Sequence, residues 1–406
     1  MTQETLLVLG AGRDQKFLVD TAKGMGLFVV GVDSDPHAAA RGHCDVFGQI
    51  SNRDPQAIVE FCRSHPQIRG QVNGVITMGS DIPEVVSVVA SDFGLKRIPL
   101  RSAEAARDKF LMKEKLSVAG VRVPEYVRCD TKRDFIRVVN SWRVPLIIKP
   151  LKLAGSKGVF LVNGAESSDE LYDKTISLSG ESAVLVEKFI EGPQISTESL
   201  IIDGEVHTVG FADRNYAEME KFHPQIMENG GWVPSLFLDL QAEIDRQLTL
   251  CARALGIRDH TLKGDVVIGK NGPVIIEVAA RLSGGDFCES LVPLSTGANY
   301  VEAAIQISLG RVPNPNPYKN VSKIVVANRY FFMEPGLQLM GVDGLEEVES
   351  HPAVKKLEFW LRPGDVTGEI SSHGARSGVF VVCGDNREEV QEVIDWVYET
   401  VKFAVA

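Results

Sequence analysis

Two acidic residues and one arginine lie in a single short segment of this 406-residue chain, and their types and spacing suit catalysis. Asp265 and Glu277 stand twelve positions apart, and Arg281 follows Glu277 by four. The residues between the acids, VVIGKNGPVII, predict two short strands joined by a turn at Lys270–Pro273. Because a hairpin sets its arms side by side and side chains alternate along each arm, we expect both carboxylates to project from one face as neighbours.

The chemistry of such a pair is limited by its charge. Two carboxylates on an apolar sheet cost free energy unless a counter-charge is present, and Mg²⁺, with Mn²⁺ as a substitute, supplies that charge and takes oxygen ligands. Arg281 adds a planar cation, and Gly284 and Gly285 add backbone N–H donors, which suit a phosphate or an acyl phosphate. The alternative is an acidic sheet edge beside an unrelated arginine.

Lysines and glycines upstream favour the phosphate interpretation. Lys109 follows Asp108, Lys149 ends the apolar run PLIIK, and KLAGSKG forms a small loop over residues 152–158. Glycines let the backbone approach a phosphate closely, and lysines neutralise it, although a lysine at a strand end often only reaches solvent. The pattern GxxxxGK[ST] does not occur, so this is not a Walker loop.

The N-terminal segment predicts a β-α-β unit. An apolar strand over residues 6–10 leads into Gly10-Ala-Gly12, and a second strand ends at Asp33. The dinucleotide fingerprint is incomplete, because Gln15 stands at the third glycine position. NAD binding is therefore the weaker alternative to a doubly wound domain whose glycine turn shapes a substrate crevice.

Composition excludes several classes of protein. No run of 18 apolar residues occurs, so no membrane span is expected, and the N-terminus does not suit a signal peptide. The net charge of −11 argues against nonspecific nucleic-acid binding, and six scattered cysteines favour reduced thiols in the cytoplasm. One helix is predicted over residues 101–120, a linker over 313–319 and an acidic helix over 387–401.

Five motifs occur in one order: Asp108-Lys109, Ile147–Pro150, Gly155–Gly158, Val186–Gly192 and Glu277-x-x-x-Arg281. With them the chain resembles ATP-grasp enzymes of the carboxylate–amine ligase kind, and is similar to halves of the carbamoyl-phosphate synthetase large subunit, to biotin carboxylase and to bacterial L-amino acid ligases. The implied fold is α/β and α+β. A Rossmann-like pre-ATP-grasp domain spans 1–104, an ATP-grasp fold of two α+β subdomains spans 105–312 with a small lid subdomain at about 115–187, and a C-terminal α+β cap spans 313–406.

The resemblance also implies roles for single residues. Asp265 and Glu277 are implied to bind Mg²⁺, and Arg281, Lys149, Gly284 and Gly285 are implied to be catalytic. The residues implied to bind ATP are Lys109, Lys149, Gly155, Ser156, Lys157, Gly158, Glu187, Lys188, Phe189, Ile190 and Gln194. Two positions depart from the family pattern. Gln194 stands where an acid usually binds the ribose, and Ala279 stands where an asparagine usually helps to hold a second Mg²⁺, so the number of metal ions stays open.

The expected reaction joins an amino acid or small carboxylate to an amine through an acyl phosphate and releases ADP and phosphate. Substrate contacts are predicted at Arg214, His223, Trp232, His260 and Ser283, although each histidine is more often structural. A homodimer is expected, and no nucleic-acid or membrane partner. The alternatives are a carbamoyl-phosphate-synthetase-like enzyme, a purine-ribonucleotide ligase, a nucleotide sensor without catalysis and an NAD-dependent oxidoreductase.

Overall fold

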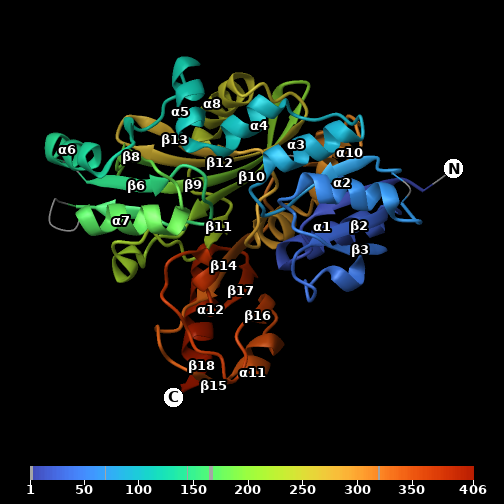
Figure 1. The fold of residues 1–406 in the computed structure, drawn as a ribbon. Helices are drawn as coiled ribbons and strands as arrows, with labels where there is room; N and C mark the ends of the chain where they lie inside the picture. Colours follow the sequence, from blue (N-terminus) through green and yellow to red (C-terminus); the bar gives the residue numbers. More distant parts are fainter. Residues whose placement is uncertain (1–2, 69, 144, 164–167, 319–320) are drawn as a thin grey trace.

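The computed structural model describes residues 3–68, 70–143, 145–163, 168–318 and 321–406 (Figure 1). Lys319, the last residue of the predicted linker, lies outside the described residues. Within the described ranges, no helix is long and apolar enough to cross a membrane.

The N-terminal part, blue in Figure 1, is a parallel sheet with the strand order β3-β2-β1-β4. Leu6 and Val8 of β1 pack in one core with α1, whereas Leu7 and Leu9 pack in another with α2 and α3. Helices therefore cover both faces, which is why β1 is apolar at every position from Leu6 to Leu9. The bounds are β1 Thr5–Leu9, α1 Arg13–Gly24, β2 Phe28–Asp33, β3 Val46–Gln49, α2 Pro55–Ser64, β4 Gly74–Ile76 and α3 Pro83–Asp92.

The glycine turn after β1 is closed by this part's own side chains. Gly10 has a φ of +100°, which favours glycine. The Gln15 side chain accepts the N–H of Gly12 at 2.8 Å and also contacts Met78. Asp33 accepts the N–H groups of Ala11 at 2.9 Å and Asp35 at 3.0 Å. Because both carboxylate oxygens of Asp33 already accept backbone N–H groups, the structure argues against a dinucleotide there.

The prediction of one helix over residues 101–120 is wrong, because two helices form, α4 (Leu100–Arg107) and α5 (Lys109–Val118). Asp108 has an extended backbone between them, and its carboxylate accepts the N–H groups of Phe110 at 3.0 Å and Leu111 at 3.1 Å. Asp108 is thus the N-cap of α5. The break places Lys109 at the first position of a new helix.

A small antiparallel sheet with the order β5-β8-β6-β7 follows, and helices α6 and α7 complete its core around Phe135 and Phe160. The bounds are β5 Tyr126–Cys129, α6 Lys132–Trp142, β6 Leu146–Pro150, β7 Phe160–Val162, α7 Ser168–Ser179 and β8 Val184–Lys188.

An eight-stranded sheet carries the rest of the chain, in the order β13-β12-β9-β10-β11-β14-β17-β16. Helices α5 and α8 share a core with β12 and β13, and α12 shares one with β14 and β17. The strands are β9 Gln194–Ile202, β10 Glu205–Arg214, β11 Gly231–Val233, β12 His260–Gly269, β13 Gly272–Ala279, β14 Val325–Phe331, β15 Leu339–Asp343, β16 Val354–Phe359, β17 Gly378–Gly384 and β18 Lys402–Val405. The helices are α8 Gln241–Ala254, α9 Val292–Thr296, α10 Val301–Ser308, α11 Leu345–Ser350 and α12 Arg387–Thr400. Strands β15 and β18 form a separate pair. The predicted mixture of α/β and α+β architecture is confirmed.

Candidate active site

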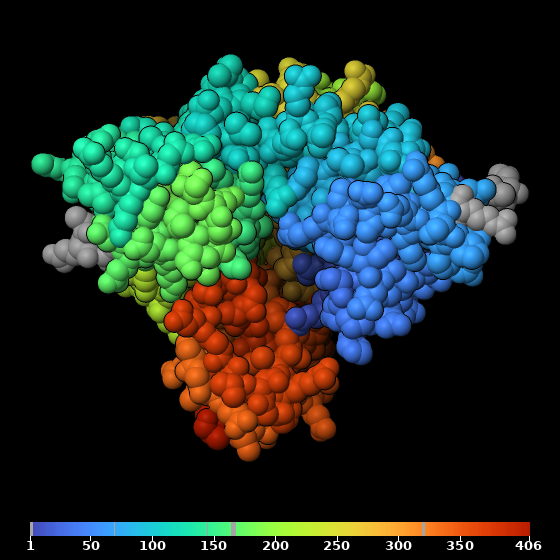
Figure 2. All heavy atoms as spheres, in the orientation of Figure 1, coloured from blue at the N-terminus to red at the C-terminus, as the bar shows by residue number. Residues whose placement is uncertain are grey.

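A cavity of about 940 Å³ lies where the N-terminal part, the two main sheets and the C-terminal region meet. Figure 2 shows a hollow between the blue, green and red surfaces at this junction. Its size suits a nucleotide with a small substrate. The predicted site residues that line it are Lys109, Lys149, Gly155, Ser156, Glu187, Lys188, Phe189, Ile190, Gln194, Arg214, Asp265, Glu277, Arg281, Ser283, Gly284 and Gly285.

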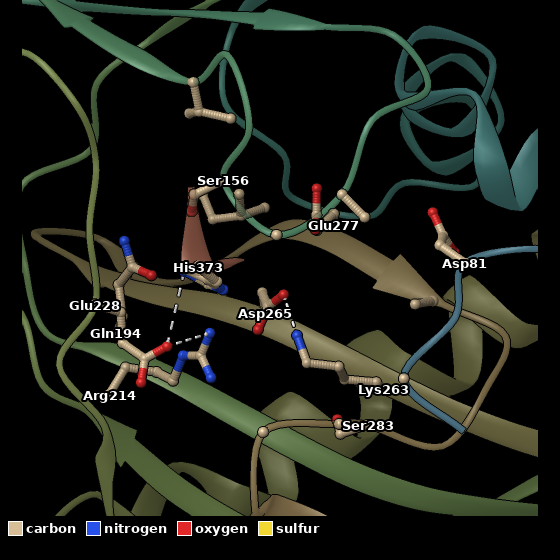
Figure 3. A pocket seen from close by; sticks show the side chains of 18 of the residues that line it. Asp81, Ser156, Gln194, Arg214, Glu228, Lys263, Asp265, Glu277, Ser283 and His373 are labelled. Atoms are coloured by element: carbon tan, nitrogen blue, oxygen red, sulfur yellow. Dashed lines mark hydrogen bonds and ion pairs between the residues drawn. The ribbon is translucent and has the colours of Figure 1, made fainter. Parts of the chain in front are cut away.

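The two carboxylates of the hairpin are register partners on β12 and β13, directly opposite each other. Asp265 is ion-paired with Lys263 (Figure 3). A Glu277 oxygen lies 3.9 Å from the Lys109 ammonium. Burial alone would raise the pKa of each acid. At Asp265 the positive charge of Lys263 outweighs the effect of burial, and at Glu277 the charges of Lys109 and Lys149 do so. Both pKa values therefore lie below their ordinary values. Both acids are therefore ionised at neutral pH.

This pair fits a magnesium site. Mg²⁺ keeps several waters and typically takes one or two protein carboxylates together with substrate phosphates. In the part of the chain that the structure describes, no group of three or more His, Cys, Asp or Glu residues could hold a metal ion. Further ligands would therefore come from water and phosphate. Ala279, which offers no ligand atom on its side chain, also lines the cavity.

The lysines converge on one buried glutamate. Lys149 of β6 and Lys113 of α5 each lie 2.9 Å from the same oxygen of Glu187 on β8. Burial alone would raise the pKa of Glu187, but the two lysines outweigh it and lower that pKa. Burial also lowers the pKa of Lys113 to about 8. Lys109 reaches the carbonyl of Leu153 at 2.5 Å, so the lysines form one cationic wall.

The segment from Glu187 to Gln194, which is predicted to bind ATP, lies along the same wall. Lys188, Phe189 and Ile190 follow the buried Glu187, and Gln194 stands where β9 begins. The N–H of Lys188 already donates to the carbonyl of Glu125 at 2.9 Å, and the N–H of Phe189 to Pro145 at 2.9 Å. These bonds fix the strand's path and leave neither N–H free for a base.

The glycine loop between β6 and β7 is folded back over the cavity. Gly155 and Ser156 both have positive φ values, +66° and +58°, and both line the cavity. The C-terminal region touches the loop, because the N–H of His373 donates to the Gly155 carbonyl at 3.0 Å. Lys157 is exposed and Gly158 packs beside Pro150, and neither lines the cavity.

Arg281 and the glycines after it meet the N-terminal part. Arg281 lies 3.8 Å from a carboxylate oxygen of Asp81. The Gly285 N–H faces the carboxylate of Asp14 at 3.5 Å, and a Cβ on Gly284 would collide with that carboxylate. Ser283 donates its hydroxyl proton to the buried Glu198, whose pKa burial raises. Because Gly284 has no side chain, this loop can lie close to Asp14 of α1.

Of the predicted substrate residues, Arg214 and Ser283 line the cavity, whereas the structure does not bring His223, Trp232 and His260 to it. The guanidinium groups of Arg329 and Arg387 lie over the Trp232 ring, 4.7 and 5.1 Å from its centre. His223 is exposed and lies 3.1 Å from Asn163. Burial lowers the pKa of His260, whose ring nitrogen lies 3.0 Å from the Thr261 carbonyl.

Sequence reasoning missed several residues that face the site. Lys113 follows Lys109 by four positions on one helix, a spacing that could have revealed it. Glu228, His373 and Arg376 gave no comparable signal, because strands from distant parts of the chain bring them together. Asp14, Lys263 and Lys356 also line the cavity.

Two family models match the chain. Residues 106–285 match the ATP-grasp domain, and residues 329–406 match the L-amino acid ligase C-terminal domain 2. The L-arginine-specific L-amino acid ligase of Bacillus subtilis is 24% identical over 316 residues, which cover 76% of this chain and 75% of that protein. The alanine–anticapsin ligase of Bacillus subtilis (strain 168) is 28% identical over 220 residues, 47% of this chain and 44% of that one.

Among solved structures, the L-amino acid ligase from Bacillus licheniformis superimposes with a TM-score of 0.84. The match covers 100% of this chain and 99% of that chain at 20% sequence identity, a likeness of fold. The family models and the named relatives agree with the motifs that surround the cavity. The chain belongs to the ATP-grasp superfamily and is a carboxylate–amine ligase.

Proposed function

We propose that this enzyme joins the carboxylate of an amino acid or small acid to an amine through an acyl phosphate, with release of ADP and phosphate. The single observation that carries the proposal is the carboxylate pair Asp265 and Glu277, opposed in register and facing Lys109, Lys149 and Arg281 across one cavity. The C-terminal match over residues 329–406 favours an amino acid substrate over a purine ribonucleotide.

In the first step, a carboxylate oxygen attacks the γ-phosphorus of ATP, and the bond from that phosphorus to the departing ADP oxygen breaks. Asp265 and Glu277 would hold Mg²⁺, which when bound neutralises phosphate oxygens. Lys109 and Lys149 supply fixed positive charge beside the phosphates, and Gly155 and Ser156 cover them. The chain's contribution to this step is positioning and charge neutralisation.

In the second step, the amine gives up a proton to water and its nitrogen attacks the acyl carbon. The bond from that carbon to the phosphate oxygen then breaks, and phosphate leaves. Arg281 and the backbone of residues 283–285 neutralise the charge that develops on the acyl phosphate. In this proposal Gly285 must exchange the Asp14 carboxylate for the reacting group.

The proposed division of labour follows the proposed domains. Residues 1–104 close the cavity beside the glycines, residues 105–312 carry the nucleotide and metal residues, and residues 313–406 complete the substrate end. The homodimer remains a prediction, which light scattering of the purified protein tests.

Phosphate release from Mg·ATP, screened against single and paired amino acids and small carboxylates, tests the function. A ligase requires a particular pair and yields a product whose mass equals their sum less water. Stimulation by bicarbonate alone would instead indicate carbamoyl- or carboxyphosphate chemistry. ATP binding without turnover across the panel would contradict the proposal and favour a sensor.

A further inference from the structure

Two arginines, the half-buried Arg214 and the buried Arg376, contact one buried glutamate, Glu228, where the large sheet meets the C-terminal region. Figure 3 shows the pair of Arg214 and Glu228. Arg214, at the end of β10, lies 3.1 Å from Glu228 Oε2, and Arg376 lies 3.0 Å from the same oxygen. Arg376 also donates to the backbone carbonyl of Glu228 at 2.8 Å. All three residues line the cavity, so their shared face is open to a ligand.

The cluster carries more positive than negative charge. Glu228 is a single carboxylate against two guanidinium groups. His373, 4.0 Å from Glu228, adds no charge at neutral pH, because burial and then Arg376 and Arg214 hold its pKa well below its ordinary value. Asp265, which also acts on Arg214, is already paired with Lys263. A buried excess of charge is costly, and an anion in the cavity would remove it.

The guanidinium groups also have hydrogen-bonding capacity to spare. The Nε atoms of Arg214 and Arg376 are buried and have no hydrogen-bond partner among the described residues. Arg376 is 8% exposed. Planar guanidinium groups match carboxylates in a two-pronged arrangement, so they fit a carboxylate better than a diffuse negative charge.

The cluster lies next to the loop at which the acyl phosphate is proposed to form. The guanidinium of Arg376 stacks on Tyr330, 3.6 Å from the ring centre. The hydroxyl of Tyr330 donates to the Gly285 carbonyl at 2.9 Å. One aromatic side chain therefore separates the arginine from Gly285, a span that a small substrate with two acidic groups could bridge.

We propose that Arg214 and Arg376 bind a second carboxylate of the carboxyl donor, so that the donor is a dicarboxylate such as an acidic amino acid. This inference rests on the proposed ligase function and adds the class of donor to it. Glu228 orients the two arginines and reduces their mutual repulsion. A phosphate group of the nucleotide is the other anion with matching chemistry, and the test separates the two.

The test measures turnover of the wild-type enzyme and of Arg376→Met with two matched pairs of donors, L-glutamate against L-glutamine and L-aspartate against L-asparagine. The amine is the one that gives the wild type its highest turnover. Label from an ¹⁸O-carboxylate that appears in the released phosphate identifies the donor. We expect the wild type to prefer the acidic donors. Arg376→Met should lower their kcat/KM about tenfold to a hundredfold, change the amide donors less than about threefold and leave the KM for ATP unchanged.

Two further variants guard against a loss of structure. Arg376→Lys keeps the charge and should retain part of the acidic preference. Arg387→Met is the matched control, because Arg387 also pairs with a carboxylate, Asp213 at 2.5 Å, but does not line the cavity. Melting temperatures of all three variants accompany the kinetics.

Three results would overturn the inference while the ligase function stands. These are a wild type that prefers neutral donors, an Arg376→Met variant whose KM rises for ATP rather than for the donor, and an equal loss for all donors together with a lower melting temperature. The third result would show that the cluster stabilises the fold and does not bind the donor. Absence of turnover with every donor in the wild type would overturn the ligase proposal as well.

Discussion

The two ends of the cavity use the same arrangement of charge with different cations. At one end a single oxygen of Glu187 faces Lys113 and Lys149, each at 2.9 Å, and at the other a single oxygen of Glu228 faces Arg214 and Arg376 at 3.1 and 3.0 Å. Each end keeps one positive charge in excess. Lysine is a compact charge that suits phosphate, whereas the arginine fork suits a carboxylate. The comparison indicates a cavity with two anion sites, one for the nucleotide and one for the substrate.

The largest effect is expected from Glu277→Gln, at the nucleotide end. The change removes one of the two opposed carboxylates and leaves Lys109, 3.9 Å away, without that counter-charge. We expect phosphate release to fall about a hundredfold or more, equally for every donor. Steady-state kinetics with an acidic and a neutral donor check this. Glu243→Gln, which removes a half-buried carboxylate partner of Arg122 away from the cavity, is the control. A loss confined to acidic donors would break the distinction between the two ends.

Gly284→Ala should affect both ends at once. An added Cβ would collide with the Asp14 carboxylate and would lie 3.1 Å from the Gly79 backbone, so the N-terminal part must move away from the glycine loop. A displacement of this kind lowers kcat about tenfold to a hundredfold. Gly24→Ala is the matched control, because nothing lies within 4 Å of the new Cβ. A kcat equal to that of the control would show that the loop and α1 are not coupled.

A smaller effect is expected from Glu289, a further acid that lines the cavity and pairs with Lys356. Lys113 and Lys149 keep Glu187 ionised, whereas burial, with Asp286 nearby, raises the pKa of Glu289 to about 7 from 4.5. Between pH 4.5 and 7 the folded state thus binds more protons at Glu289 than the unfolded state, and stability falls as the pH rises. Glu289→Gln should remove this contribution. Melting temperatures measured from pH 5 to 7 should fall less steeply in the variant, and parallel curves would contradict the assignment.

The smallest effect is expected from Asp108→Ala. The change removes the N-cap of α5 and should lower the free energy of unfolding by about 1 kcal/mol. Denaturant titration measures it. Because Lys109 and Lys113 lie on this helix, the KM for ATP should rise slightly while the preference among donors stays constant. A changed donor preference would mean that the two ends are not independent.

Sequence reasoning succeeded where the signal is local. Asp265 and Glu277 sit on a hairpin whose turn and alternating residues are contiguous, so their register could be predicted. It failed at Asp108, where one aspartate separates two helices instead of continuing one. It could not find Arg376 and Glu228, which are 148 positions apart and meet only through the large sheet.

The prediction for Trp232 shows a different limit. Its strand β11 pairs with β10, whose last residue Arg214 lines the cavity. Successive residues of a strand point to opposite faces, however, and Trp232 points toward Arg329 and Arg387. A polar loop gives no indication of which face its aromatic residue will take. The assignment of faces needed the pairing of β11 with β14, which the sequence does not encode locally.

That pairing has a consequence for how specificity can diversify. Strand β11 pairs with β14, with Gly231 opposite Asn328 and Val233 opposite Val326. Main-chain hydrogen bonds therefore make the residues after 325 part of the central sheet. Exchange of the C-terminal region between relatives would need matched strand register, and its removal would expose an open sheet edge prone to aggregation. New substrate preferences should therefore evolve by replacing side chains on a fixed scaffold, and recombination of whole modules should be rare in this lineage.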